Sequence, residues 1–402
     1  MSKKKLSRET ITKDVKKFKS KHILCELPTG TGKSKVALDF IHFKNIKGKI
    51  LIVIPRLVLI DNWKDEFKKW GYEDYLQDVE FTTYISIVKY AGQSFDIVIY
   101  DEAHHLSDRA LSGVEAIKSN YSFLLSATVP KSLKEALHGM WKDFKVYSVQ
   151  MRQAIDNDIL PDPRVILIPL SLDNTKVTEC YEMNCKIDSS PITISYDQRF
   201  KYAKLKTPCI VRCTAQQYYD NISYFVDRYK KMYLRTGNKR FYYLWQQRAL
   251  ERLKYLSGSK NNLVLILLKV LEDKRTLTFC NSIDQTKILG KYCINSENKD
   301  SFINLTKFNN HRINHITACN MINEGVNLVD CQVGIFVSIN SSEIMVKQKN
   351  GRILRHKAPI IIIPYYVKTR EEELVQKMLF NYNPSLVVKT NNLKDFKYEI
   401  NN

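Results

Sequence analysis

The chain has few of the residues that mark fibrous or disordered proteins. Its 402 residues include only 13 Gly and 11 Pro, whereas hydrophobic residues make up 44%. This composition excludes a collagen-like or low-complexity polymer and is sufficient for substantial hydrophobic cores. Apolar runs such as 263–268 and 360–363 are far shorter than the roughly 20 residues of a membrane-spanning helix. We therefore expect a soluble, folded protein without a membrane partner.

Acidic residues are too few to balance the basic ones. The 63 Lys and Arg residues against 42 Asp and Glu give a formal net charge of +21. This excess favours a polyanionic partner, with nucleic acid ahead of an anionic membrane surface. No apolar stretch follows the lysines at positions 3–5, so we expect no secretory signal, and an odd number of cysteines favours free thiols. The expected location is the cytoplasm, of a bacterium or a phage-infected host cell.

Short apolar runs alternate with amphipathic stretches in two parts of the chain. Such alternation predicts parallel sheets covered by helices, and thus two α/β units. The proline-containing segment 156–163 is the best linker, which gives domains at 1–160 and 161–402. A polar, tyrosine-rich stretch at 171–259 is expected to be a mainly helical insertion, with helices at 218–234 and 240–256. Strands are expected at 23–25, 50–54, 79–84, 97–100 and 123–125, then at 165–170, 276–279, 313–317, 333–337 and 360–363, with helices at 33–43 and 57–70.

The sharpest motif lies between the first expected strand and the first expected helix. Its glycines let backbone N–H groups turn around an oxyanion, and the helix N-terminus adds the positive end of its dipole. Lys33 can reach the β- and γ-phosphates, and the Ser34 hydroxyl can ligate Mg²⁺. The general pattern opens with Gly where this chain has Leu27. The sequence predicts an ATP-binding loop made of Pro28, Thr29, Gly30, Thr31, Gly32, Lys33 and Ser34.

Two adjacent carboxylates end the strand expected at 97–100. In open α/β sheets, ligands lie beyond the carboxyl ends of the strands. Asp101 is then placed to hold Mg²⁺, and Glu102 to orient and deprotonate an attacking water. Alone, such a pair is usually a solvated turn. After a phosphate loop in the same unit, it predicts a hydrolytic site.

These motifs resemble the signature motifs of superfamily 2 helicases of the DEAH type. The subgroup with the closest resemblance is the restriction-subunit-like and phage recombination-type DNA helicases. The resemblance implies two tandem RecA-like domains, with ATP and Mg²⁺ bound between them. It runs in order from about residue 20 to 360, through 28–34, 101–104, 126–128, 278–282, 323–328 and 348–355, and implies coupling roles for His104, Ser126, Thr128 and Gly325.

The sixth of these motifs has its own physical logic. Phosphoryl transfer builds charge on the γ-phosphate, and a guanidinium stabilises that charge. Arg352 and Arg355 are three residues apart, so on a helix they share a face, which Gln348 can join. We expect these side chains to complete the ATP site from the second domain when the cleft closes. The family's usual Arg at the next position is Lys349 here.

Contacts with nucleic acid are implied chiefly by the resemblance. It assigns them to Pro55 and Arg56, in a motif that includes Trp63, and to Asn281 and Ser282. An ion-pair role is the alternative for Arg56. In the insertion, basic and aromatic residues interleave at 228–233 and 239–245, which suits phosphate contact and base stacking. The alternative is a purely structural role, in which those aromatic side chains pack inward from amphipathic helices.

The same insertion holds four cysteines in two pairs. Four thiols can bind Zn²⁺ tetrahedrally, but these spacings are not tight C-x-x-C knuckles. Reduced structural cysteines are the main expectation, and zinc the alternative. The four are Cys180, Cys185, Cys209 and Cys213.

The expected function is an ATP-dependent DNA helicase or translocase, a monomeric motor or part of a replication or repair complex. The motifs leave RNA as an alternative substrate, and a translocase that does not unwind as another. A non-catalytic nucleic-acid clamp is the alternative from a different class. The family's glutamine motif for adenine is missing upstream of the phosphate loop, where Arg8 is its nearest remnant.

Overall fold

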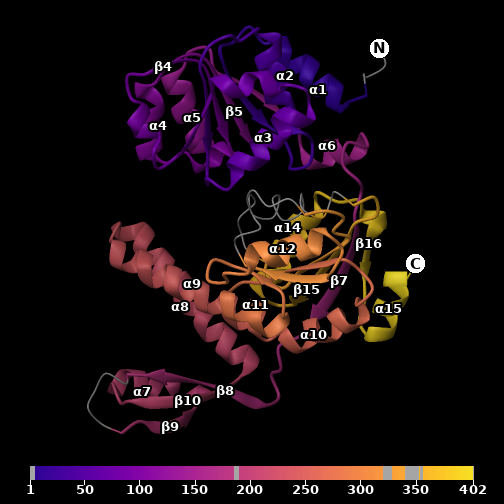
Figure 1. Ribbon diagram of the computed structural model, residues 1–402. Coiled ribbons are helices and arrows are strands. Elements are labelled where there is room, and N and C mark those ends of the chain that lie inside the picture. Colours follow the sequence, from indigo (N-terminus) through magenta and orange to yellow (C-terminus); the bar gives the residue numbers. More distant parts are fainter. Residues whose placement is uncertain (1–4, 185–189, 320–327, 340–352, 354–355, 402) are drawn as a thin grey trace.

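The computed structural model of the protein describes residues 5–184, 190–319, 328–339, 353 and 356–401. It contains two α/β lobes, each built on a parallel sheet, and a peripheral element that projects from the second lobe (Figure 1). The predicted fold class is confirmed. Among the described residues, no helix combines the length and apolarity needed to cross a membrane.

The first lobe is a six-stranded sheet in the order β3-β2-β4-β5-β1-β6, with every neighbouring pair parallel. Side chains alternate between its two faces, so each face has its own core: Ile52 and Ile99 lie in one, Val53 and Val98 in the other. Helices must therefore cover both faces. The strands are β1 (His22–Glu26), β2 (Ile50–Ile54), β3 (Val79–Thr83), β4 (Ser94–Asp101), β5 (Lys118–Ser126) and β6 (Lys145–Ser148), and the helices are α1 (Arg8–Lys16), α2 (Lys33–Phe43), α3 (Leu59–Lys69), α4 (Asp108–Ala116), α5 (Lys131–Met140) and α6 (Met151–Asp156).

The second lobe repeats this plan with seven parallel strands in the order β12-β13-β11-β14-β15-β7-β16. Strand β7 directly follows the linker after α6, and it pairs with β15 from far along the chain. The strands are β7 (Arg164–Leu170), β11 (Thr276–Phe279), β12 (Cys293–Ile294), β13 (His315–Ala318), β14 (Val333–Phe336), β15 (Ile360–Tyr366) and β16 (Val387–Lys389), and the helices are α10 (Asn261–Val270), α11 (Ile283–Leu289), α12 (Ser301–Asn309), α14 (Arg370–Leu379) and α15 (Leu393–Asn401).

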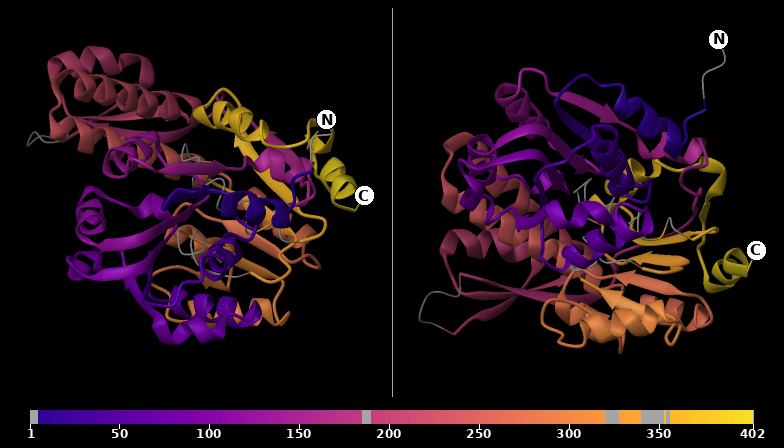
Figure 2. Two further views of the ribbon diagram at one scale, coloured as in Figure 1. Left: turned by 90° about the horizontal axis from the view of Figure 1, so that it is seen from above. Right: turned by 45° about the horizontal axis from the view of Figure 1, so that its top comes forward.

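The expected insertion emerges between β7 and α10. Its two long helices, α8 (Ala215–Thr236) and α9 (Lys239–Gly258), form an antiparallel hairpin that turns at Gly237, where φ is +64°. In all three ribbon views this hairpin lies at the edge of the molecule (Figure 1, Figure 2). The sequence analysis missed a small sheet at its base, made of β8 (Val177–Met183), β9 (Ile192–Ser195) and β10 (Cys209–Thr214), with α7 (Arg199–Leu205) beside it.

Candidate active site

The predicted site residues of the first lobe meet at one edge of its sheet. The strand registers pair Glu26 with Ser126, and Asp101 with Leu125, so the carboxyl ends of β1, β4 and β5 are level. The phosphate loop follows β1, and Glu102 follows β4. Parallel pairing thus gathers residues such as Lys33 and Glu102, which are 69 positions apart along the chain, into one pocket.

The loop that leads into α2 has the backbone of an anion cradle. Gly30 and Gly32 have φ values of +92° and +94°, in the left-handed region that favours glycine. Thr31 braces the turn, because its hydroxyl donates to the carbonyl of Pro28 at 2.8 Å. The hydroxyl of Thr29 is buried and has no hydrogen-bond partner among the described residues. Such an orphaned group fits a loop shaped for an absent oxyanion.

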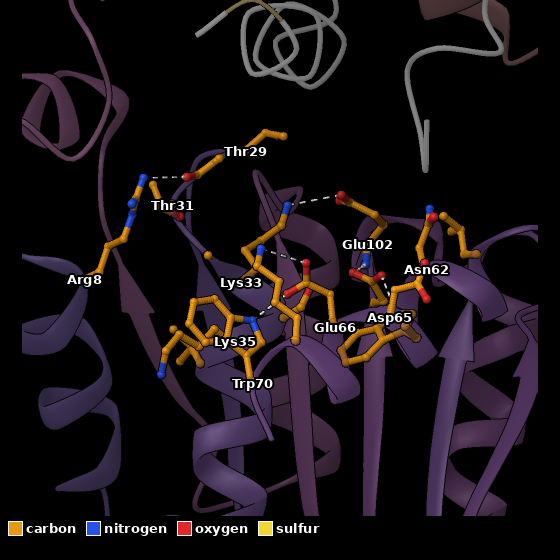
Figure 3. Close-up of a pocket in the computed structure, with 18 of the residues that line it drawn as sticks. Arg8, Thr29, Thr31, Lys33, Lys35, Asn62, Asp65, Glu66, Trp70 and Glu102 are labelled. Carbon is orange, nitrogen blue, oxygen red and sulfur yellow. Dashed lines mark hydrogen bonds and ion pairs between the residues drawn. The ribbon is translucent and has the colours of Figure 1, made fainter. Parts of the chain in front are cut away.

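A pocket of about 550 Å³ opens in front of this loop. Its lining includes Ser34, Asp101 and Glu102 together with residues of α1 and α3 (Figure 3). This volume lies within the range of small-molecule and cofactor sites. The phosphate loop and both predicted carboxylates therefore face one cavity, as the motif order predicts.

A chain of polar contacts links the predicted ATPase motifs. Lys33 Nζ lies 3.1 Å from Glu102 Oε1, and Glu102 Oε2 lies 3.5 Å from His104 Nδ1. His104 Nδ1 is in turn 3.1 Å from the hydroxyl of Ser126, which donates to the carbonyl of Thr128 at 2.9 Å. The side chains of Lys33 and Glu102 are only 10% and 14% exposed. The geometry connects the phosphate loop to the end of β5 through four side chains.

Asp101 is held by a residue that the sequence analysis placed elsewhere. Trp63 of α3 is buried, and its Nε1–H donates to Asp101 Oδ2 at 3.0 Å. The backbone N–H of Glu102 donates to the other oxygen, Oδ1, at 2.9 Å. The side chain of Trp63, which the sequence grouped with Pro55 and Arg56, thus contacts a carboxylate of the predicted ATP site. A tertiary contact across 38 residues leaves no signal in the local sequence.

The same surroundings set the ionisation of Asp101. Burial of the carboxyl group and the neighbouring charge of Glu102 raise the pKa of Asp101 to about 6. Lys33 and the two hydrogen bonds act in the opposite direction. A buried carboxylate whose pKa is raised by a neighbouring carboxylate is an attractive site for a divalent cation, because the cation's charge favours the ionised form.

Arg8 occupies a position that the sequence left open. It begins α1, and its Nη2 donates to the carbonyl of Gly30 at 3.3 Å and to the carbonyl of Ile159 at 3.1 Å. It also lines the pocket in front of the phosphate loop (Figure 3). The side chain thus contacts the loop backbone and the segment that leads out of the lobe.

Two family models match this chain. The model described as type III restriction enzyme, res subunit, covers residues 3–89, and that described as helicase conserved C-terminal domain covers residues 259–357. The two matched regions lie one in each lobe. The first matched region contains the phosphate loop, and the second contains strands β11, β12, β13 and β14 of the second sheet.

Known proteins resemble this chain in sequence over a part of it or in fold over most of it. The DNA 3'-5' translocase XPB2 of Sulfurisphaera tokodaii is 35% identical over 124 residues, which cover 28% of this chain and 28% of that protein. S. cerevisiae Dbp5, solved with RNA and ADP BeF3, aligns with 100% of this chain and 93% of its own at a TM-score of 0.62 and 8% identity. The type ISP restriction-modification enzyme LlaBIII, solved with DNA, covers 100% of this chain and 32% of its own at a TM-score of 0.54 and 13% identity. The Hef helicase domain of Pyrococcus furiosus covers 92% and 97% at a TM-score of 0.50 and 13% identity.

Several predicted residues of the second lobe lie outside the described part of the chain. They are Gly325, Gln348, Lys349, Arg352 and Arg355. Described residues between and directly after the two arginines are informative. Ile353 is fully buried, and a Cβ added at Gly334 of β14 would overlap its Cδ1 atom. His356 and Lys357 line a cavity together with Arg8 and Gly30 of the first lobe.

The predicted nucleic-acid contacts follow the ends of two strands, one in each lobe. Pro55 and Arg56 come directly after β2, and Arg56 is exposed. Asn281 and Ser282 follow β11, and the Ser282 hydroxyl caps α11 by accepting from the N–H of Gln285 at 3.2 Å. These positions agree with a surface along the sheet edges of both lobes.

The predicted four-cysteine zinc site does not fit the small sheet. Cys209 and Cys213 are four residues apart on β10, which separates them by about 13 Å. Two sulfurs on one zinc ion lie at most about 4.6 Å apart, since each Zn–S bond is about 2.3 Å. Cys180 is on the neighbouring β8, and Cys185 is outside the described residues. The spacing of Cys209 and Cys213 on β10 thus contradicts a zinc site shared by all four thiols, which the sequence offered as the alternative to reduced cysteines.

Proposed function

We propose that this protein hydrolyses ATP at the edge of its first sheet and uses the cycle to move along DNA. The observation that carries the proposal is the contact chain from Lys33 through Glu102 and His104 to Ser126, built at the mouth of a phosphate loop. These contacts connect Lys33, which would bind the phosphates, with Ser126 at the end of strand β5. Binding and release can then alter the shape of the lobe.

The residues divide the chemistry among them. Backbone N–H groups of the loop and the Lys33 ammonium bind the phosphates, and Ser34 and Asp101 would hold Mg²⁺, which neutralises charge on the phosphate oxygens. Glu102 is the base that orients and deprotonates the attacking water. Lys33 also pairs with Glu102, so a bound phosphate would compete with Glu102 for the Lys33 ammonium. The segment 101–104 is thus proposed as the DEAH box of this core.

The second lobe would supply Arg352 and Arg355, with Gln348, to stabilise charge on the γ-phosphate. Two described contacts support this. Ile353 is anchored on β14 against Gly334, which fixes the middle of the arginine motif to the second sheet. Residues 356 and 357, directly after the motif, line a cavity beside Gly30 of the phosphate loop.

DNA is the proposed substrate for movement because the names of two similar proteins mention DNA. The translocase XPB2 is 35% identical over the matched part, and LlaBIII, similar in fold, was solved on DNA. The net charge of +21 fits a phosphate backbone of either kind. RNA is the second candidate, because Dbp5 has the same fold and was solved with RNA. Phosphate contacts through Pro55, Arg56, Asn281 and Ser282 would serve both.

The insertion supplies a further proposed contact surface. Between residues 228 and 243 the hairpin carries six basic residues and no acidic one. Tyr233, Tyr242 and Trp245 pack on one another across the two helices, which agrees with the structural alternative for those rings. Tyr243 is different, because it is 67% exposed next to the basic tip. The tip is therefore suited to phosphates, with one ring open for stacking.

The test is ATP turnover measured with single-stranded DNA, duplex DNA and RNA at low and moderate salt. We expect DNA to stimulate turnover most, and Lys33→Ala and Glu102→Gln to abolish it. Lys47→Ala, which removes an exposed lysine just after α2, is the matched control. Full turnover in both active-site variants would contradict the proposed ATPase site and favour a non-catalytic nucleic-acid clamp. Strongest stimulation by RNA would favour an RNA helicase.

A further inference from the structure

Residues 5–8, which precede and begin α1, contact residues 157–159, the exit segment through which the chain leaves the first lobe. Lys5 Nζ lies 2.6 Å from Asp158 Oδ2, and the backbone N–H of Leu6 donates to Asn157 Oδ1 at 2.9 Å. Arg8 Nη2 donates to the carbonyl of Ile159 at 3.1 Å. Three successive residues of the exit segment are therefore each held by one residue of the segment 5–8.

The same arginine also reaches the phosphate loop. Its Nη2 atom donates to Gly30 at 3.3 Å, so one nitrogen with two hydrogens bridges the loop carbonyl and the linker carbonyl. The next linker residue, Leu160, packs directly on the loop, because a Cβ added at Gly30 would lie 3.1 Å from its Cδ2. The phosphate loop and the linker are thus connected by the hydrogen bonds of Arg8 and by the apolar contact of Leu160 with Gly30.

Both ends of the linker are anchored, but to different bodies. Helix α1 is fixed to the first lobe through Ile11 and Val15, which are fully buried. On the far side, the N–H of Arg164 donates to the carbonyl of Pro359 at 3.0 Å, and β7 then pairs with β15 in the second sheet. Reorientation of the lobes must therefore be absorbed at 161–163, next to the residues that Arg8 and Leu160 hold against the phosphate loop.

We propose that Arg8 is a positioning residue that couples the phosphate loop to the interdomain linker, so that nucleotide occupancy biases the orientation of the second lobe. The proposal rests on the proposed function, since it requires that ATP and DNA bind one molecule. If the Gly30 carbonyl shifts when phosphate binds, its hydrogen bond to Arg8 Nη2 changes. Because Nη2 also donates to the Ile159 carbonyl, the shift is passed to the linker. Arg8 therefore acts through the linker and the loop.

The experiment measures the coupling directly. DNA affinity is determined for the full chain with and without a non-hydrolysable ATP analogue, and the ratio of the two dissociation constants is the coupling factor, which in linked systems is typically about 5- to 150-fold. In Arg8→Gln we expect this factor to fall about fivefold toward one, while affinity for the analogue alone changes less than about threefold. Arg8→Lys keeps a charged donor and retains part of the coupling. Lys13→Gln, on the exposed face of the same helix, leaves it unchanged.

Two results would overturn the proposal. One is an unchanged coupling factor in Arg8→Gln. The other is a loss of analogue affinity in the absence of DNA that accounts for the whole effect, because Arg8 would then be a nucleotide ligand. Failure of the proposed function looks different: the wild-type protein itself would show no effect of the analogue on DNA binding.

Discussion

Replacing Trp63 by Phe removes one hydrogen bond from Asp101 and leaves a buried ring in place. The lost bond is the one from the indole Nε1–H to Oδ2, at 3.0 Å. A hydrogen bond to a charged group contributes about 1.5–3 kcal/mol. Since one pKa unit corresponds to about 1.36 kcal/mol, loss of the bond corresponds to about one to two units.

The direction of the change follows from which form the bond favours. The indole stabilises the ionised carboxylate and so lowers the pKa of Asp101, which burial and Glu102 have already raised to about 6. Trp63→Phe raises the pKa further. If the carboxylate must be ionised to hold Mg²⁺, activity is then lost at a higher pH on acidification.

The assay is kcat/KM for ATP hydrolysis as a function of pH, which reports groups of the free enzyme. We expect the acid limb of Trp63→Phe to lie about one to two pH units above that of the wild-type protein. Trp70→Phe is the matched control, because Trp70 lines the same pocket from α3's end and donates to Glu66, at 2.8 Å, rather than to Asp101. An acid limb that is identical in Trp63→Phe and wild type would refute the reasoning.

Three further predictions concern the second lobe and the hairpin. Lys260→Met leaves Glu371, its buried partner at 2.6 Å, without a counter-ion, and we expect a loss of about 3–5 kcal/mol in the free energy of unfolding measured with urea; an unchanged midpoint would contradict this. Gly334→Ala forces Ile353 out of its place, so ATP turnover should fall while ATP-analogue affinity is kept, and equal turnover would show that Ile353 does not position the arginine motif. Neutralising three exposed basic residues at the hairpin tip should weaken DNA binding and reduce the slope of log affinity against log salt by about two to three, whereas the same charge loss on β16 and α15 should not; the two sets are R235Q, K239Q and R240Q, and K389Q, K394Q and K397Q.

Sequence patterns predicted the sheets well because their strands are buried on both faces. The runs at 50–54 and 276–279 coincide with β2 and β11, and the helix expected at 33–43 coincides with α2. Buried parallel strands are nearly continuous apolar runs, and the intervening helices carry a 3.6-residue period. The phosphate loop and the Asp101–Glu102 pair were found for a related reason, since each directly follows such a strand.

The features that sequence could not predict depend on side chains far apart in the chain. The strands β8 and β9 are largely exposed, and the mostly buried β10 is interrupted by the exposed Arg212, so none of the three has a long apolar run. The bond from Trp63 to Asp101 and the two bonds of Arg8 arise only after the sheet has brought these segments together. The residues next to Trp63 and Arg8 in the sequence therefore do not indicate which distant groups these side chains contact.

If ATP hydrolysis drives movement along DNA, the moving protein must push aside an obstacle bound to that DNA. The most direct measurement is displacement of streptavidin from the end of biotinylated single-stranded or duplex DNA. We predict displacement that requires hydrolysable ATP and disappears in Glu102→Gln. Streptavidin that stays bound on both kinds of DNA, while DNA still stimulates ATP turnover, would contradict the account.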